Sequence, residues 1–152
     1  MAFNFQGLVD AVASYAGTTG EFDAVNTHEP KAKPSNGVTC SIWIAELAPI
    51  ASASGLNSVT GLVTMTMRIQ RPFLSQPADQ IDPLILQACA SLMGVFAGGF
   101  TMGETVRDVD LLGAHSQGLH AKAGYVNQDN TVFRIMDVTL PLVVNDLFPE
   151  VP

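Results

Sequence analysis

Two stretches of the sequence repeat their apolar residues at the spacing of an α-helix. Near the start, apolar residues recur at i, i+3, i+4, i+7 and i+11, which places them on one face of a short amphipathic helix. Gly17 and Gly20 are expected to end this helix. Its apolar face is formed by Phe5, Leu8, Val9, Val12 and Ala16.

The second helix is expected to begin at Asp82-Pro83, because Asp caps free N–H groups and Pro lacks a donor where none is needed. Gly98-Gly99 is expected to end it. Its apolar residues cover most of the circumference: Leu84, Ile85, Leu86, Ala88, Cys89, Leu92, Met93, Val95 and Phe96. A helix apolar on most sides is expected to be buried on most sides. We therefore expect a central helix that packs on a sheet and against a neighbouring subunit.

Strands are expected in most of the remaining chain. Residues 38–46 are rich in β-branched and aromatic side chains. Over residues 63–70, apolar and polar residues alternate until Pro72 ends the strand. Further extended segments are expected at 21–25, at 104–112, and in a hairpin of 119–127 and 131–144 that closes around Gln128-Asp129-Asn130.

Two polar segments are expected to be loops, because residues 28–37 contain two prolines and Asn36-Gly37, and residues 48–58 are small and polar. The resulting order of helix, strands, long helix and strands predicts an α+β fold. We expect a mostly antiparallel sheet packed against the long central helix, with a short N-terminal helix. The 152 residues contain no repeat and no second core, which favours a single domain over 1–152.

The composition is poor in charge, at 14% charged residues against 47% hydrophobic ones. Ordinary domains contain about 25% charged residues. Such a chain is too hydrophobic to be disordered. No uncharged apolar run approaches the roughly 18–20 residues that a bilayer requires, so we expect no membrane span. The shortage of charge predicts that part of the surface faces another protein chain.

The net charge of −7, from 7 basic and 14 acidic residues, argues against tight binding of nucleic acid. The N-terminus has neither the basic nor the apolar region of a signal peptide, which predicts a protein that stays in the cytoplasm or in an assembly formed there. Cys40 and Cys89 are isolated, so we expect two buried thiols in a reducing compartment and no metal site.

Three groups of residues are candidates for chemical function. Ser116, between His115 and His120, lacks the preceding glycine of a nucleophile elbow and is expected in a polar turn. Asp108 and Asp110, beside Arg107, have no third ligand, which favours an exposed strand edge or an intersubunit salt bridge. Residues 98–103 are glycine-rich, but no lysine follows to reach a phosphate. The five methionines at 65, 67, 93, 102 and 136 are expected to fill the core. No catalytic or cofactor-binding motif remains.

The chain resembles the tail terminator, or tail completion, proteins of long-tailed, non-contractile bacteriophages, especially those of actinobacterial phages. None of the matching segments is a catalytic motif, but they run in order over nearly the whole chain. They are residues 22–30 (FDAVNTHEP), 54–56 (SGL), 81–83 (IDP), 107–114 (RDVDLLGA), 124–126 (GYV) and 140–146 (LPLVVND).

The resemblance implies a structural virion protein without enzymatic activity, cofactor or metal. Such proteins form a hexameric ring on the head-proximal end of the tail tube, stop tube polymerisation and present a surface to head-completion proteins. The implied partners are other copies of the chain, the tail tube protein and a neck protein, with DNA passing through the lumen unbound. The implied location is the virion tail, assembled in the host cytoplasm.

The family motifs do not define the interfaces, so the candidate contact residues are chosen from charged side chains and loops. Loops 30–37 and 48–58 are either docking elements or simple connectors. The candidates are Arg68, Arg71, Arg107, Asp108, Asp110, His28, Glu29, Lys31 and Lys33.

Two other functions remain open from the residues alone. The first is another structural role, as a neck or head–tail connector protein or as a tail-tube-like subunit. The second is a small hydrolase or ligand-binding domain built around His115, Ser116, His120, Asp108 and Asp110.

Overall fold

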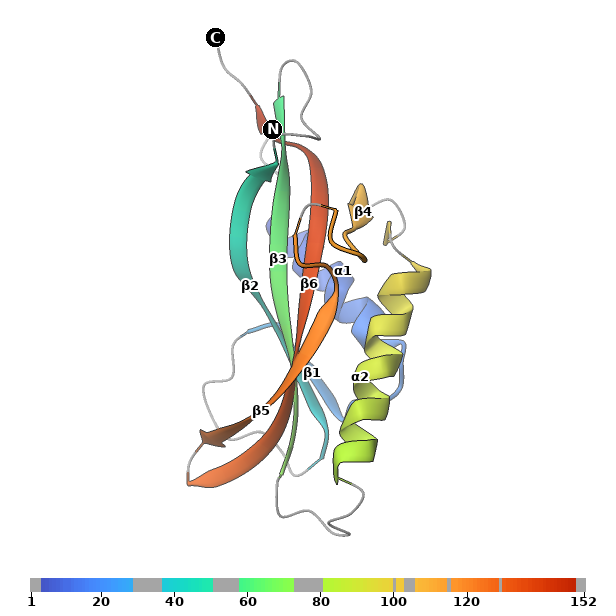
Figure 1. Cartoon of the computed structure of the whole chain (residues 1–152), viewed down its shortest axis with the longest axis vertical. Helices are drawn as coiled ribbons and strands as arrows, with labels where there is room; N and C mark the ends of the chain where they lie inside the picture. Colours follow the sequence, from blue (N-terminus) through green and yellow to red (C-terminus); the bar gives the residue numbers. More distant parts are fainter. Residues whose placement is uncertain are drawn as a thin grey trace.

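Two helices lie on one side of a six-stranded sheet in the computed structural model (Figure 1). The structure describes residues 4–28, 37–50, 58–72, 81–99, 101–102, 106–114, 116–128 and 130–149. The sheet is mixed but mostly antiparallel, and both helices contribute to the core beside it. The expected α+β fold, with a short N-terminal helix and a long central helix, is therefore confirmed.

The sheet is built around two long central strands, β3 (Ser58–Pro72) and β6 (Thr131–Pro149). The strand order is β1-β2-β3-β6-β4, and β5 also pairs with β6. Only the contact between β1 and β2 is parallel. Since β3 occupies one side of β6 along its whole length, β4 and β5 share the other side. The outer strands are β1 (Ala24–Asn26), β2 (Thr39–Ile50), β4 (Asp108–Val109) and β5 (His120–Gln128).

One face of the sheet, which we call the helical face, packs against both helices. Side chains alternate between the two faces of a strand, and the apolar set of β3 lies on the helical face. The core there includes Cys40, Ile42, Val63, Met65, Met67, Ile69, Val138, Leu140 and Leu142. The opposite face, which we call the open face, carries the alternate residues of the same strands. The sequence alternation in residues 63–70 thus correctly predicts which side is buried.

Helix α1 (Phe5–Gly17) has the expected amphipathic face, with Leu8, Val12 and Ala16 buried. The side chain of Asn4 caps its start, because Asn4 Oδ1 accepts a hydrogen bond from the Gly7 backbone N–H at 3.0 Å. Burial of three side chains on one stripe fixes α1 against β2 and α2.

Helix α2 (Ile81–Gly98) begins before Asp82, so the expectation that Asp82 caps the helix is wrong. The Asp82 carboxylate instead accepts a hydrogen bond from Arg134 Nε of β6 at 3.0 Å. The expectation that α2 is buried on most sides is also wrong within one subunit, since Leu84 and Leu86 are 37% and 59% exposed. The helix presents one buried face to the sheet and leaves an apolar face uncovered.

α2 is also long and apolar enough to cross a membrane, with a mean hydropathy of 1.5 over its 18 residues. This test of length and mean hydropathy tolerates the polar Gln87 and Ser91 and the charged Asp82, whereas the sequence contains no uncharged apolar run of that length. In this fold Leu92 and Phe96 anchor α2 in the core, and a core helix passes the same test of length and composition.

Several strand boundaries differ from the predicted ones. Strand β2 continues to Ile50 and β3 begins at Ser58, so both predicted bounds of the loop at 48–58 are wrong. Pairing of β2 with β3 overrides the weak strand preference of this segment. Residues 51–57 lie outside the described part of the chain. Of the strand expected at 104–112, the described residues 106–112 form only β4, while β6 runs five residues beyond 144, to Pro149.

The predicted hairpin is confirmed, with Gln128 opposite Thr131 and Asn130 at a φ of 63°. The expected burial of both cysteines is confirmed as well. Burial, together with the neighbouring Cys89 thiol, raises the pKa of Cys40 to about 12, and burial also raises the pKa of Cys89. The five methionines lie in the core or pack against it.

Candidate functional site

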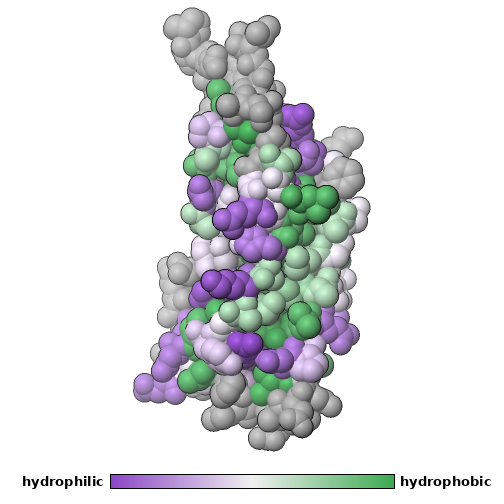
Figure 2. Space-filling view, in the orientation of Figure 1, coloured by the Kyte–Doolittle hydropathy of each residue, from purple (hydrophilic) through white to green (hydrophobic). Residues whose placement is uncertain are grey.

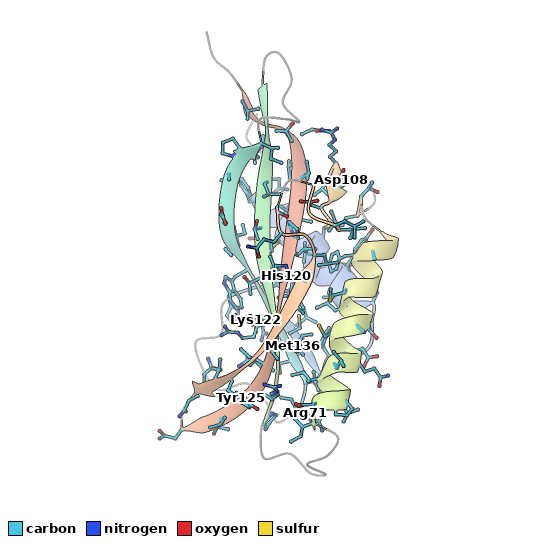
Figure 3. All side chains as sticks on the ribbon, viewed as in Figure 1. Arg71, Asp108, His120, Lys122, Tyr125 and Met136 are labelled. Atoms are coloured by element: carbon cyan, nitrogen blue, oxygen red, sulfur yellow. The ribbon has the colours of Figure 1, made fainter. Side chains whose placement is uncertain are left out.

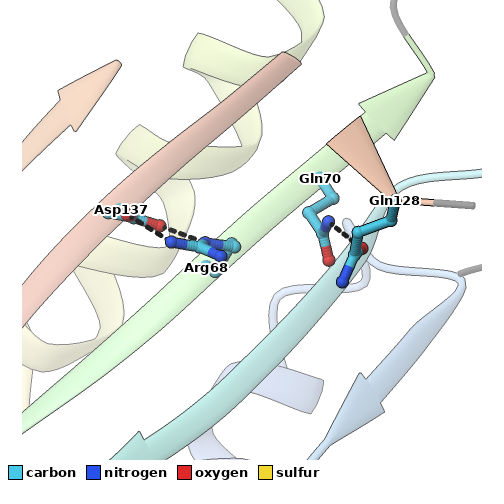
Figure 4. A network of polar contacts seen from close by, with 4 residues as sticks. All are labelled: Arg68, Gln70, Gln128 and Asp137. Carbon is cyan, nitrogen blue, oxygen red and sulfur yellow. Dashed lines mark hydrogen bonds and ion pairs between the residues drawn. The ribbon is translucent and has the colours of Figure 1, made fainter. Parts of the chain in front are cut away.

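An ion pair occupies the middle of the open face. Arg68 of β3 donates to both carboxylate oxygens of Asp137 of β6, at 2.8 and 3.0 Å (Figure 4). The Arg68 guanidinium also lies 5.3 Å from the centre of the Trp43 ring. Both charged side chains are partly exposed, at 21% and 32%, so the pair contributes no more than about 1 kcal/mol. Arg68, a predicted interface residue, is thus engaged within its own subunit.

The same face is hollowed beside this ion pair. A hollow of about 690 Å³ is lined by residues of β2, β3, β6 and the loop before β5, among them Glu46, Thr64, Ser116 and His120. A second hollow, of about 410 Å³, extends along β5 past Lys122 and shares His120 with the first. His120, Lys122 and Tyr125 follow one another along β5 (Figure 3). Because His120 lines both hollows, they form one polar concavity on the open face.

Asp110 holds together the loop that borders this concavity. It is 4% exposed and accepts hydrogen bonds from the Ala114 backbone N–H and the Ser116 hydroxyl, both at 2.7 Å. The Ser116 hydroxyl oxygen in turn accepts from the Gly118 backbone N–H at 3.0 Å. The polar turn expected here is confirmed, whereas the expectation that Asp110 lies on an exposed strand edge is wrong.

The arrangement of Ser116 and His120 does not resemble an activated nucleophile. The Ser116 hydroxyl donates its proton to Asp110, while His120 Nδ1 donates to the Gly118 carbonyl oxygen at 2.8 Å. No hydrogen bond joins Ser116 to His120 in the described residues. The other candidate histidine, His115, lies outside them. A general base must reach the proton that it removes. The geometry therefore supports a structural role for Ser116.

Replacing Asp110 by alanine is expected to destabilise the subunit by about 1–3 kcal/mol, because the Ser116 hydroxyl and the Ala114 N–H lose a buried acceptor to which both are hydrogen-bonded. Asp108, which is only half-buried, provides the matched control, and Asp108→Ala is expected to change stability by no more than about 0.5 kcal/mol. Urea unfolding followed by tryptophan fluorescence measures both variants. Equal losses in the two variants would contradict the role given to Asp110.

Arg134 and Arg71 lie directly opposite each other at the lower end of β6 and β3. Arg134 is well satisfied: besides Asp82, it contacts the Gly124 carbonyl oxygen at 3.2 Å and stacks 4.5 Å from the centre of the Tyr125 ring. Arg71 Nε is buried and has no hydrogen-bond partner among the described residues. Among the predicted interface cations that the structure describes, Arg71 is the one with a buried polar atom that lacks a hydrogen-bond partner.

The remaining predicted interface residues do not gather at one place. Arg107 is exposed near the upper end of the sheet, where its Nη1 lies 3.4 Å from Asn145 Oδ1. Asp108 follows it in β4, and His28 is exposed on the segment after β1. Glu29, Lys31 and Lys33 lie outside the described residues. The three described positions, Arg107, Asp108 and His28, therefore define no single surface.

Exposed apolar side chains mark surfaces on β2 and β5 that the sequence analysis missed. Ile44 and Leu47 are 40% and 46% exposed on β2, and Tyr125 is 58% exposed on β5. Apolar surface also covers the outer side of α2 (Figure 2). Strand alternation places Ile44 on the helical face. The sequence contains no signal, however, that the helices leave this side chain uncovered.

Within the described ranges, no group of three or more His, Cys, Asp or Glu residues is placed to hold a metal ion. Neither a comparison with protein-family models nor a search of curated proteins finds a match to this chain. The geometry of the chain itself must therefore support any functional proposal.

Proposed function

We propose that this protein is a structural subunit of a phage tail, which forms a ring at the head-proximal end of the tail tube, ends tube polymerisation and offers a joining surface to a head-side partner. The observation that carries this proposal is the exposure of large apolar side chains on separate parts of a charge-poor subunit. Leu86 is 59% exposed on α2, Leu47 46% on β2 and Tyr125 58% on β5. Surfaces of this kind are typical of protein–protein contacts.

A ring accounts for several such surfaces on one chain. In a ring, each subunit uses one surface to meet the next subunit and a different surface to meet the previous one. A terminal ring also meets the tube on one side and a neck protein on the other. The resemblance in sequence to tail terminators suggests six copies, and it suggests the virion tail as the location.

The net charge of −7 supports a lumen through which DNA passes without binding, since acidic walls repel phosphates at short range. The proposal includes no enzymatic activity, cofactor or membrane contact. The hydrogen bonds of Ser116 and Asp110 within one loop support a structural subunit more than a hydrolase.

Electron microscopy of the purified protein mixed with tail tubes tests this function. We expect a single ring at one end of each tube and no long polymers of the protein alone. Polymerisation without tubes would favour a tube-like subunit, and binding to a head-side partner without tubes would favour a neck protein. A ring whose lumen is lined by Lys and Arg would contradict the account of the negative charge.

The hydrolase alternative makes a separate prediction. If Ser116 and His120 were catalytic, phage carrying Ser116→Ala and His120→Ala would lose infectivity although their tails assemble. We expect instead that such phage complete their tails and infect at the normal titre at a permissive temperature. A loss of infectivity with complete tails would contradict the structural role.

A further inference from the structure

Two arginines of the central strands lie side by side on the helical face. Ile69 of β3 is buried in the core on that face, and Arg71 follows it by two residues. Arg71 is directly opposite Arg134 of β6, and side chains in such positions have Cβ atoms about 5 Å apart. Like charges directly opposite each other in a sheet are destabilising. An anion bound beside the two arginines would offset this repulsion.

Only one of the two guanidinium groups is satisfied within the described residues. Arg134 donates to Asp82 Oδ1 at 3.0 Å and to the Gly124 carbonyl oxygen at 3.2 Å, and it stacks on the Tyr125 ring. Arg71 Nε is buried without a hydrogen-bond partner, and no ion pair joins Arg71 to a described acidic side chain. A buried donor without an acceptor costs free energy. Arg71 therefore lacks the acceptor that Arg134 has.

The surroundings of the two arginines are positive on an otherwise acidic protein. Asp82 is the only acidic side chain that pairs with either arginine in the described part of the chain. Helix α2 begins one residue before Asp82, and a helix N-terminus adds a partial positive charge. Two guanidinium groups thus face one carboxylate here, although the whole chain has a net charge of −7. An anionic group is therefore attracted to this end of the helical face.

An apolar hollow adjoins the arginines. It has a volume of about 440 Å³ and lies between the first turns of α2 and the strands β5 and β6. Leu86 lines it and is 59% exposed, while Tyr125, which stacks on Arg134, is 58% exposed. Arg71, Tyr125 and Met136 all lie toward the end of the sheet where α2 begins (Figure 3). The described lining residues are Asp82, Pro83, Ile85, Leu86, Ala123, Arg134 and Met136.

We propose that the two arginines and this hollow, together called the arginine site, bind a segment of a partner protein that carries an Asp or Glu side chain next to an apolar one. Arg71 is only partly buried, so its terminal nitrogens can donate to the partner's carboxylate, a group that guanidinium matches in geometry. The apolar side chain fills the hollow. This inference rests on the proposed function only for the identity of the partner, which is a neighbouring protein of the tail.

A protein carboxylate fits this site better than a nucleic-acid phosphate does. Surfaces that bind nucleic acid neutralise several phosphates with many Lys and Arg side chains. Here a single unpaired guanidinium lies beside an apolar hollow, and the net charge of −7 opposes the approach of DNA. Arginine and tyrosine beside exposed apolar side chains are typical of protein–protein contacts.

Titration with hexanoate, a carboxylate on a short apolar chain, tests the site on the isolated protein. The NMR signals of the Arg71 Nε–H and of the Ala123 amide are expected to shift together with one dissociation constant. Arg71→Met, which keeps an unbranched side chain but removes the guanidinium, is expected to weaken binding about tenfold, the effect of losing one charge-assisted hydrogen bond. Hexanol, which lacks the charge, is expected to bind about tenfold more weakly than hexanoate. Arg107→Met, near the other end of the sheet, is the matched control and should leave the affinity unchanged.

Substitution by glutamate separates binding from a role in stability. In Arg71→Glu a carboxylate lies opposite Arg134, so the cross-strand repulsion becomes an attraction. We expect this variant to melt about 2–4 °C higher than the unchanged protein and to lose hexanoate binding. Arg134→Glu is the matched control, and it is expected to melt lower because it loses the contacts with Asp82 and Tyr125. A lower melting temperature of Arg71→Glu would assign Arg71 a structural role within the subunit and overturn the arginine site.

An acidic residue of the chain itself is the alternative partner of Arg71. Asp79 is the one acid between Arg71 and Asp82 in the sequence and lies outside the described residues. We expect Asp79→Asn to leave the melting temperature and hexanoate binding unchanged. A loss of stability in Asp79→Asn that disappears when Arg71 is also replaced by Met would show that Asp79 pairs with Arg71, and this would overturn the proposal.

Assembly separates the arginine site from the function on which its partner depends. Arg71→Glu is expected to raise the protein concentration at half-occupancy of tube ends, or at half-assembly of rings, by about tenfold or more, as the loss of a central interface arginine does. Normal rings and normal capping by this variant would overturn the docking role and leave the ring function intact. Hexanoate binding by a protein that forms no ring, alone or on tubes, would overturn the proposed function alone. Inorganic phosphate that shifts the Arg71 signal at lower concentration than hexanoate would favour nucleic acid and overturn the choice of a protein carboxylate.

Discussion

Replacing Phe96 by alanine is expected to destabilise the subunit by about 3–5 kcal/mol, the usual range for removing a buried phenylalanine. Phe96 is fully buried near the end of α2, and its ring centre lies 5.8 Å from that of Tyr15 of α1. Its ring therefore helps to join both helices to each other and to the core. Truncation would leave a cavity where the three parts meet.

Leu86 provides the matched control on the same helix, because its side chain is 59% exposed. We expect Leu86→Ala to change the free energy of unfolding by no more than about 0.5 kcal/mol. Urea unfolding can follow both variants through Trp43, the only tryptophan. Similar losses in the two variants would contradict the placement of α2. If α2 also faces a partner, Leu86→Ala should weaken assembly without changing unfolding.

Replacing Gly118 by alanine is expected to destabilise the subunit by about 2–5 kcal/mol. This is the sum of two effects, the strain of a positive φ in a residue with a side chain and the steric clash of the new Cβ. Gly118 has a φ of 83°, and a Cβ there would lie 2.9 Å from both the Leu111 carbonyl oxygen and the Gly113 backbone nitrogen. These are backbone atoms of the loop that Asp110 holds, so they cannot move aside as a flexible side chain can.

Gly20 separates the two effects. Its φ of 69° is similar, but a Cβ there would meet nothing within 4 Å. Gly20→Ala should therefore cost only the strain of a positive φ, about 1–2 kcal/mol. The difference between the two variants in urea unfolding measures the clash alone. No difference between them would mean that the loop around Gly118 relaxes freely, contrary to the close packing described.

The regular elements were largely predictable because their signals are local. The spacing of Leu8, Val12 and Ala16 predicts α1, and the alternation from Val63 to Ile69 predicts both β3 and its buried side. The hairpin followed from Asn130, which adopts the positive φ that its turn needs. Boundaries were less predictable, as at Ile50, because strand ends depend on the neighbouring strand that continues the pairing.

The candidate site was only partly predictable. Asp110 and Asp108 are equivalent in the sequence pattern, yet one is buried within a loop and the other is half-buried. Arg68 was expected at an interface, but Asp137, 69 positions further along the chain, pairs with it. Contacts over such a distance follow from strand register, which a single sequence does not specify.

The sequence by itself determined the class of fold, the two helices, the buried side of β3 and the shortage of charge, since composition and short-range periodicity contain that information. Only the tertiary structure decided which surfaces remain uncovered. The exposed sides of Ile44, Leu47 and Tyr125 result from where the helices and strands stop covering one another. The physical reason is that burial is a property of packing between distant segments. The shortage of charge predicts a partner, and the packing shows which apolar surfaces remain exposed.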